Sequence, residues 1–487
     1  MTKPTIQTLK ELKESSYQSK SIQQELAENL KKKISKGQNA FEGIHGYDHT
    51  VIPNLERAIL SGHNINLMGL RGQAKTRLAR GMTNLLDEWM PIIKGSELND
   101  DPLSPITIEG NNIIDHKNDQ TPIDWLHRSE RFFEKLATPD VTIADLIGDI
   151  DPIKASQLKL TYADQRVIHF GMIPRAHRCI FALNELPDLQ ARIQVSLFSI
   201  LQEKEVQIRG FKIRLPLNVL FVFTANPEDY TNRGSIVTPL KDRIGSQILT
   251  HYPRSINIAK TITLQEAQVQ NITTDKITVP ELALDLLEQI SFEARKSEYV
   301  DNRSGVSARL SISAYENLIS NAQRRLLKSK QKTTQIRISD FLGTISAING
   351  KIELTYEGEQ LGPEKVAFEL INQSIKTLLP KHFPPIKKLT KTQEKDPYDF
   401  LIHWFMEDHQ IELTDQMNDT KRKKIISSVP GLEEFLLNES KKLDSKDVLF
   451  HAEFLLWGIS AHKKISRYQI QGGHRFKDSI GSFINRL

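Results

Sequence analysis

Cysteine is almost absent from this chain of 487 residues, which contains a single one, Cys179. One cysteine excludes disulfide bonds within the chain and any zinc site built from several thiolates. Because Cys179 lies in an apolar run, we expect a buried structural thiol rather than a nucleophile. The 14 histidines show no H-E-x-x-H motif or other metal-ligand spacing. The sequence therefore predicts no protein-bound transition metal.

Long apolar runs are missing as well. No segment approaches the roughly 20 apolar residues that cross a membrane, and residues 1–33 lack the apolar core of a signal peptide. We therefore expect no membrane span and a cytoplasmic location. The net charge of +5 is small and does not by itself indicate a nucleic-acid partner.

The most informative segment is the run Gly69-Leu-Arg-Gly-Gln-Ala-Lys75-Thr76. It follows a short apolar stretch and precedes a helical pattern, so the sequence predicts a strand, a tight loop and a helix. Backbone N–H groups of such a loop converge on an anion. In the pattern G-x-x-x-x-G-K-[ST], Lys75 would reach the β- and γ-phosphates and Thr76 would hold Mg²⁺. Ala74 stands where the second glycine is usual.

Apolar runs and helical periods alternate over residues 41–255, which predicts an α/β core with a parallel sheet. The strand candidates are Ile65–Met68, Ile106–Ile108, Cys179–Leu183 and Val219–Phe223. The helical candidates that follow the core are Val279–Arg295, Ser307–Leu327 and Ile338–Gly350. The charged stretch from Trp125 to Arg131 is interpreted as a solvated helix face, with the ATP pocket or a subunit interface as the alternative.

The predicted domain order has five parts. Three prolines between positions 378 and 386 cannot sit inside helices, so a linker is expected there. The parts are an N-terminal helical segment (1–40), the α/β core (41–255), an all-helical domain (256–375), the linker (376–395) and a small helical C-terminal domain (396–487).

Polar residues follow two of the apolar strand candidates. Asn184 and Glu185 end the run that starts at Cys179, and Asn226 ends the run that starts at Val219. In ATP-hydrolysing proteins a carboxylate at such a strand end polarises the attacking water, which fits Glu185, and an Asp beside it organises Mg²⁺. Asn184 stands at that Asp position without its charge. Ordinary polar strand ends, and a turn at Asn226-Pro, are the alternative interpretations.

Two arginines have positions that could serve phosphate chemistry. Arg243 ends a helical segment and could reach a neighbouring subunit's phosphates as an arginine finger does. Arg309 would begin a helix, where a cation is unfavourable unless an anionic partner is present. A solvated arginine and a surface salt bridge are the alternatives.

Taken together, these motifs resemble the AAA+ ATPases and, within them, the magnesium chelatase I-subunit and MoxR-like branch. That branch often has the loop G-x-P-G-x-[AG]-K-[ST], which accommodates Ala74. The resemblance implies a P-loop AAA+ core with a parallel sheet and hairpin inserts, followed by an all-α lid and a small helical C-terminal domain. The hairpins are expected near Asp149–Pro152 with His169–Arg178, and at Gln202–Pro216.

The same resemblance implies roles for the site residues. ATP is expected to contact Gly69, Gly72, Gln73, Ala74, Lys75, Thr76 and Arg77, and Mg²⁺ to lie at Thr76 and Asn184. Glu185 would activate water, Asn226 would be sensor 1, Arg243 the finger in trans and Arg309 sensor 2.

The expected function is an ATP-hydrolysing motor that works as a ring, expected to be a hexamer. It would remodel a partner protein or drive metal insertion, and the partner would carry an integrin-like metal-binding domain. Two alternatives remain open. One is a nucleotide-gated scaffold that does not hydrolyse ATP, motivated by Asn184. The other is a nucleic-acid-handling AAA+ protein, which the absence of a GAFTGA-type loop and of a helix-turn-helix argues against.

Overall fold

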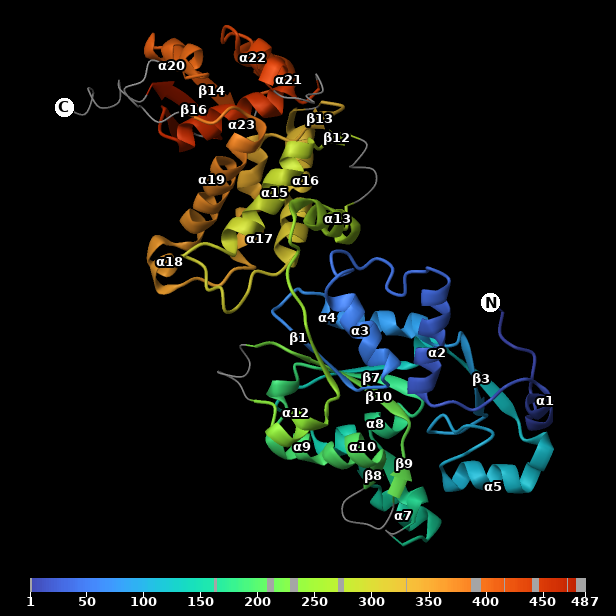
Figure 1. The fold of residues 1–487 in the computed structure, drawn as a ribbon. Coiled ribbons are helices and arrows are strands. Elements are labelled where there is room, and N and C mark those ends of the chain that lie inside the picture. Colours follow the sequence, from blue (N-terminus) through green and yellow to red (C-terminus); the bar gives the residue numbers. More distant parts are fainter. Residues whose placement is uncertain are drawn as a thin grey trace. The chain divides into compact units, whose positions relative to one another are not determined.

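The computed structural model describes residues 2–161, 164–207, 214–227, 235–269, 276–329, 331–386, 396–415, 417–439, 446–470 and 472–478. The chain divides into two compact units, Met1–His251 and Tyr252–Leu487 (Figure 1), and each is described by itself. Among the described residues, no helix combines the length and the apolar character that crossing a bilayer requires.

A five-stranded sheet with the order β11-β1-β10-β7-β4 forms the centre of the first unit. Its strands are β1 (Ile65–Met68), β4 (Phe132–Leu136), β7 (Cys179–Asn184), β10 (Val219–Ala225) and β11 (Ser246–Leu249). All neighbouring strands pair in parallel. The carboxyl ends of all five strands therefore lie along one edge, which is where α/β sheets place their ligands.

Helices of the first unit cover both faces of this sheet (Figure 1). The described α-helices are α1 (Leu9–Glu14), α2 (Ile22–Ser35), α3 (Val51–Leu60), α4 (Lys75–Gly81), α5 (Ile108–Lys117), α6 (Ile143–Leu146), α7 (Pro152–Leu158), α8 (Met172–Arg175), α9 (Ala191–Ser196), α10 (Phe198–Glu203) and α12 (Thr238–Arg243). The described 3₁₀ helices are η1 (Met82–Leu85), η2 (Asn118–Gln120), η3 (Arg128–Glu130), η4 (Gln165–Val167) and η5 (Leu186–Asp188).

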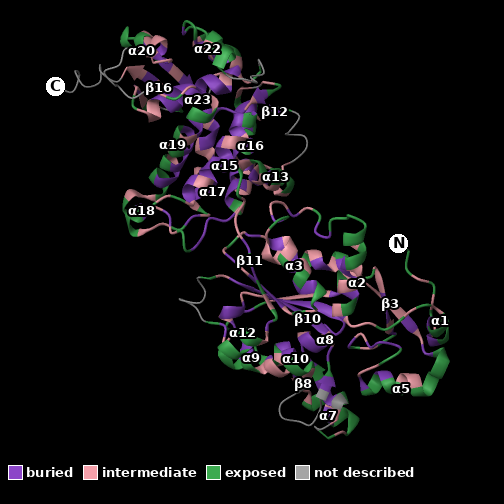
Figure 2. Cartoon of the chain, in the orientation of Figure 1, coloured by how far each residue is buried: buried purple, intermediate pink, exposed green. Residues whose placement is uncertain are grey.

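Successive side chains of β7 and β10 alternate between two apolar cores. Ile180 and Val222 pack with α2, α3 and α4, whereas Phe181 and Phe221 pack with α8, α9 and α10. Both strands are buried along almost their whole length (Figure 2). A strand covered on both faces has an unbroken apolar sequence, and this is why these two strands are recognisable in the sequence.

Three antiparallel strand pairs complete the first unit. They are β2 (Trp89–Ile93) with β3 (Ile123–His127), β5 (Gly148–Ile150) with β6 (Ile168–Phe170), and β8 (Glu205–Gln207) with β9 (Arg214–Pro216). The second and third pairs confirm the two predicted hairpins. The end of the third, residues 208–213, lies outside the described residues.

The second unit has helices around one continuous apolar core. Its described helices are α13 (Ile256–Glu266), α15 (Glu281–Ala294), α16 (Arg309–Ser329), η6 (Ile338–Thr344), α17 (Ile345–Asn349), α18 (Tyr356–Leu361), α19 (Pro363–His382), α20 (Asp399–Met406), α21 (Asp419–Ile426), α22 (Leu432–Glu439) and α23 (Val448–Ala461). Its described strands are β12 (Ile277–Thr278), β13 (Thr334–Gln335), β14 (Ile411–Thr414), β15 (Ile465–Ile470) and β16 (Gly473–Asp478).

The core of the second unit joins residues from both sides of the expected linker. Leu286 and Leu318 belong to the same apolar cluster as Leu401 and Trp457. The helices at the C-terminal end are accompanied by a three-stranded antiparallel sheet, β14-β16-β15, which the helical expectation did not include. The division into lid, linker and C-terminal domain stays a prediction.

The expectation that prolines exclude helix from position 378 onward is wrong. Helix α19 continues through Pro380 to His382. A proline removes the N–H that would bond to the carbonyl four residues earlier, which here belongs to Lys376. Helix α19 ends two residues after Pro380, so the lost bond falls in its last turn.

Two further local expectations are wrong. Ile106–Ile108 is not a strand, because the Asp100 carboxylate accepts the N–H of Ile106 at 2.7 Å and Thr107 caps α5. Such local side-chain bonds compete with strand pairing. The stretch from Trp125 to His127 belongs to β3, not to a helix face, and pairs with β2.

The N-terminal helical segment packs on the first unit through α2. Leu26 and Leu30 of α2 are fully buried, and its Glu25 makes a two-armed ion pair with buried Arg131 at 2.6 Å. A second buried pair joins Arg178 to Asp101 at 3.2 Å. Cys179 is buried between these groups, and burial raises its thiol pKa to about 11, so it is the structural thiol that the sequence predicts.

Candidate functional site

The loop between β1 and α4 lies at the carboxyl edge of the parallel sheet. Its first amide, of Gly69, donates to the carbonyl of Ala225 on β10 at 3.1 Å. Two residues of the loop have left-handed backbone, Gly72 with φ 71° and Ala74 with φ 56°. When left-handed residues alternate with right-handed ones, their successive N–H groups can point to one common centre, and this forms a concave binding site for an anion.

Gly69 occupies a position where no side chain fits. A Cβ there would lie 2.0 Å from Oγ1 of Thr250 and 2.2 Å from Oε1 of Gln73. These two atoms are themselves hydrogen-bonded at 2.7 Å. The glycine at the start of the motif therefore serves a close approach between the loop and the segment after β11.

Two residues distant in sequence, Tyr47 and Thr250, hold Gln73 and the loop in place. The Tyr47 hydroxyl donates to the carbonyl oxygens of Gln73, at 2.9 Å, and of His251, at 2.7 Å. Thr250 bonds the Gln73 side chain, as described above. Sequence reasoning missed Tyr47, Thr250 and His251, because nothing in their local sequence distinguishes them from other core and turn residues.

Lys75, at the start of α4, and Asn226, after β10, are in direct contact. The Lys75 ammonium donates to Oδ1 of Asn226 at 2.6 Å, to the carbonyl of Leu70 at 3.0 Å and to that of Gly69. These bonds hold the ammonium group inside the loop. Thr76 and Arg77 follow in the first turn of α4, Thr76 half-buried and Arg77 exposed.

Asn184 and Glu185 are joined to β10 through one hydroxyl. Oγ1 of Thr224 donates to Oδ1 of Asn184 at 3.1 Å and accepts the backbone N–H of Glu185 at 3.1 Å. Glu185 has φ 57°, a left-handed conformation that is uncommon for a residue with a side chain. Such strain concentrates at functional positions.

Glu134 lies beside Asn184 and was not found from the sequence. The Asn184 amide donates to Oε1 of Glu134 at 2.7 Å, while Oε2 of Glu134 pairs with Arg80 of α4 at 2.6 Å. Glu134 is on β4, the strand that pairs with β7. A carboxylate is thus present next to the amide that replaces the expected Asp.

The two predicted arginines belong to other elements of the fold. Arg243 at the end of α12 donates to Gln202 at 2.9 Å and to the Pro239 carbonyl at 2.8 Å, and its guanidinium stacks over Phe198 of α10. Arg309 belongs to the second unit, where its backbone N–H donates to Ser307 at the start of α16. Within the part of the chain that the structure describes, no three His, Cys, Asp or Glu side chains converge as metal ligands.

Comparison with known families now adds to this geometry. Residues 125–244 match the family model of the AAA domain, dynein-related subfamily. Residues 125–244 of this chain are thus similar to an AAA domain. The matched range contains Glu185, Asn226 and Arg243, and the loop that contains Lys75 precedes it. The parallel sheet with its two hairpins and covering helices, together with the helical second unit, is an AAA+ fold.

Solved structures with distant similarity include NtrX from Brucella abortus in complex with ADP, at 14% identity and a TM-score of 0.36, covering 60% of this chain and 53% of that one. The chain thus spans about half of the length of that NtrX. The complex of the magnesium chelatase subunits BchI and BchD matches at 16% identity and a TM-score of 0.33, covering 66% and 98%. Hsp104 with ATPγS and casein matches at 12% identity and a TM-score of 0.35, covering 59% and 46%.

Proposed function

We propose that this chain is an ATPase that binds MgATP at the Gly69–Thr76 loop and hydrolyses it with Glu185. The single observation that carries the proposal is the convergence of Lys75, Asn226 and Thr224 with the Asn184–Glu185 strand end at one edge of the sheet. These contacts support the proposal, because phosphoryl transfer needs a phosphate-binding loop, a lysine and a carboxylate close to one another.

The residues present fit such a ligand. The loop offers backbone N–H groups around the left-handed residues Gly72 and Ala74, and Lys75 offers an ammonium group for the β- and γ-phosphates. Thr76 would hold Mg²⁺ directly and Asn184 through a bound water. Bound MgATP supplies the phosphoryl group and the metal charge that offsets its negative charge. Glu185 would orient the attacking water and accept its proton.

The carboxylate of Glu134 would provide the negative charge that Asn184 lacks. In this arrangement the Asn184 amide links Glu134 to Thr224. The negative charge near the metal would then come from Glu134, on the neighbouring strand, and not from an Asp at position 184.

An exchange of Asn184 for aspartate tests this arrangement. Asn184→Asp replaces a 2.7 Å hydrogen bond by two facing carboxylates, and like charges this close repel. Without Mg²⁺ we expect the melting temperature of the variant to fall by about 3–6 °C, and Mg²⁺ should restore part of it. The double variant Asn184→Asp/Glu134→Gln should recover the wild-type value. An Asn184→Asp variant as stable as wild type would contradict the role given to Glu134.

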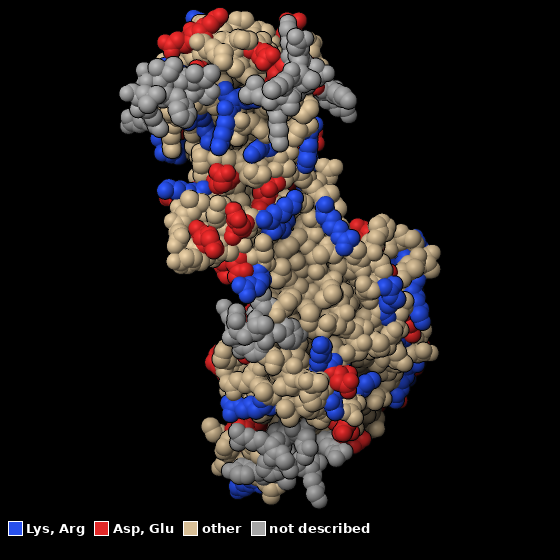
Figure 3. All heavy atoms as spheres, turned by 60° about the vertical axis from the view of Figure 1, so that its left-hand side comes forward, with Lys and Arg blue, Asp and Glu red and all other residues tan. Residues whose placement is uncertain are grey.

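We further propose that the chain acts as a ring, in the manner of the magnesium chelatase and MoxR-like branch, and remodels a partner protein or drives metal insertion. The position of Arg243 at the end of α12 supports this proposal. Gln202 and Phe198 of α10 in the same subunit hold its guanidinium group, and the phosphates of a neighbouring subunit could contact it there. The partner with an integrin-like domain and the hexameric ring remain part of this proposal. On the face drawn in Figure 3, basic and acidic side chains lie interspersed within each unit.

Mixing two inactive variants tests the ring. Arg243→Ala and Glu185→Gln should each release phosphate at background rate when assayed alone. In mixed rings some sites combine an intact Glu185 with an intact Arg243 from the neighbour. We expect the equimolar mixture to recover up to about a quarter of the wild-type rate if subunits mix at random. No recovery, with both variants shown by sedimentation to assemble and by titration to bind ATP, would contradict a finger acting in trans.

A further inference from the structure

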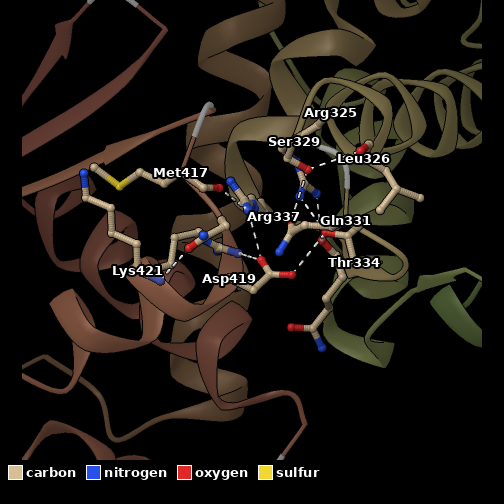
Figure 4. A network of polar contacts seen from close by, with 12 residues as sticks. Arg325, Leu326, Ser329, Gln331, Thr334, Arg337, Met417, Asp419 and Lys421 are labelled. Carbon is tan, nitrogen blue, oxygen red and sulfur yellow. Dashed lines mark hydrogen bonds and ion pairs between the residues drawn. The ribbon is translucent and has the colours of Figure 1, made fainter.

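A cluster of buried ion pairs fills the junction between the helices and the small sheet of the second unit (Figure 4). Arg325 pairs with Asp340 at 2.7 Å, Arg337 with Asp419 at 2.9 Å, and Arg422 with Asp419 at 3.1 Å and with Glu453. The side chains of all three arginines are almost completely buried. Buried guanidinium groups of this kind require a partner for each N–H.

Arg337 differs from its two neighbours in this respect. Its NH2 group donates to the Met417 carbonyl at 2.7 Å and to Asp419 at 2.9 Å. Its Nε and NH1 atoms are buried and have no hydrogen-bond partner among the described residues, although the residue is only 1% exposed. A buried donor without a partner carries the full cost of its lost hydration.

His474 also has buried nitrogen atoms without hydrogen-bond partners among the described residues. It lies on β16, is 3% exposed, and neither ring nitrogen has a hydrogen-bond partner among the described residues. Its ring packs edge-on against Trp457 with centroids 4.7 Å apart. Arg337 and His474 line one small cavity of about 20 Å³, together with Arg422, Glu453, Trp457 and Thr414.

The balance of donors and acceptors decides what this cavity can hold. Nε and NH1 of Arg337 carry three N–H bonds, and a neutral imidazole adds one donor and one acceptor. A water molecule would fit by size, since it needs roughly 10–15 Å³, but it donates as many hydrogen bonds as it accepts. An occupant that accepts only, which is an anion, matches the excess of donors.

The charges of the cavity point the same way. Two guanidinium groups, Arg337 and Arg422, and one carboxylate, Glu453, line it. Burial, with Arg422 and Arg325 nearby, lowers the pKa of Arg337 to about 10, and burial with Arg467 lowers the pKa of His474 to about 4. With a neutral His474 the lining residues alone carry one positive charge in excess, and Asp419, outside the lining, pairs with both Arg337 and Arg422.

We propose that this cavity is a binding site for one small inorganic anion of about the size of chloride, held between Arg337 and His474. The bound anion joins the start of η6, which Arg337 precedes, to strand β16 of the small sheet, which carries His474. The volume of the cavity excludes nucleotides and larger phosphate esters, so this site is distinct from the proposed ATP site in the first unit.

Thermal unfolding of the full chain tests the proposal. At constant ionic strength and pH 7.5, replacing gluconate by chloride should raise the melting temperature of wild type by about 3–6 °C and reach saturation, as binding to the folded state alone requires. In Arg337→Met this chloride dependence should disappear. The matched control is Arg475→Gln. Arg475 lies on the same strand as His474 and pairs with the surface residue Glu412, so this variant should keep the chloride dependence. Equal chloride dependence in all three proteins would overturn the proposal.

A second variant and a direct observation guard against a failure of Arg337→Met to fold. His474→Phe keeps the ring that packs on Trp457 and removes the N–H, so the chloride concentration for half of the effect should rise about tenfold. In crystals of the full chain grown with bromide, an anomalous peak within hydrogen-bond distance of Nε and NH1 of Arg337 is expected. An unaltered half-effect concentration in His474→Phe, or a water in place of bromide, would overturn the assignment.

Discussion

Replacing Lys75 by alanine is expected to lower the affinity for MgATP by about 100-fold or more and to remove phosphate release with it. The ammonium group is held inside the loop by the Gly69 and Leu70 carbonyls and by Asn226. Hydrogen bonds to charged groups contribute about 1.5–3 kcal/mol each, and two such bonds to phosphate oxygens account for this factor. Equilibrium titration with a fluorescent ATP analogue measures it.

The matched control for this variant is Lys36→Ala, which removes the same charge from an exposed position at the end of α2. It should bind ATP as wild type does. Loss of binding in both variants would indicate a general charge effect, and wild-type affinity in Lys75→Ala would contradict the assignment of the loop as the phosphate site.

Replacing Glu185 by glutamine is expected to separate binding from hydrolysis. The amide keeps the size of the side chain and the hydrogen bond from the Glu185 backbone to Thr224, but it cannot accept a proton from water. ATP affinity should stay within about twofold of wild type, while phosphate release should fall by about 10²–10⁴-fold, the usual contribution of a general base. Binding is measured by the same titration and release by a coupled phosphate assay.

The control variant is Glu42→Gln, an exposed carboxylate before α3, which should leave both quantities unchanged. A Glu185→Gln protein that hydrolyses ATP at the wild-type rate would transfer the role of base to another group. Because the variant should bind ATP without hydrolysing it, it should also retain the partner protein, whose recovery from a lysate in the presence of ATP would identify the client.

The sequence was most informative where a function is encoded by neighbouring residues. The Gly69–Thr76 loop, Lys75 and the strand ends at Glu185 and Asn226 are local patterns, and β7 and β10 are unbroken apolar runs because both of their faces are covered. The fold class followed from these. The meeting of Lys75 with Asn226 could be predicted because the carboxyl ends of parallel strands share one edge.

What remained hidden depends on pairs that only the folded chain creates. Glu134 becomes a neighbour of Asn184 through the pairing of β4 with β7, at a separation of 50 residues. Tyr47 and Thr250 reach Gln73 from either end of the first unit's sequence. Pro380 was misread for a related reason, because burial of Leu378 and Leu379 in the folded chain holds the last turn of α19 although the proline removes one of its bonds.

The most direct test of the central claim is steady-state phosphate release from MgATP by the full wild-type chain, measured beside Glu185→Gln at the same protein concentration. The account predicts a rate that saturates with MgATP and exceeds that of the variant by about 100-fold or more. Equal, background-level rates in the two proteins, with ATP binding intact in both, would contradict it and would leave a nucleotide-gated scaffold in place of a motor.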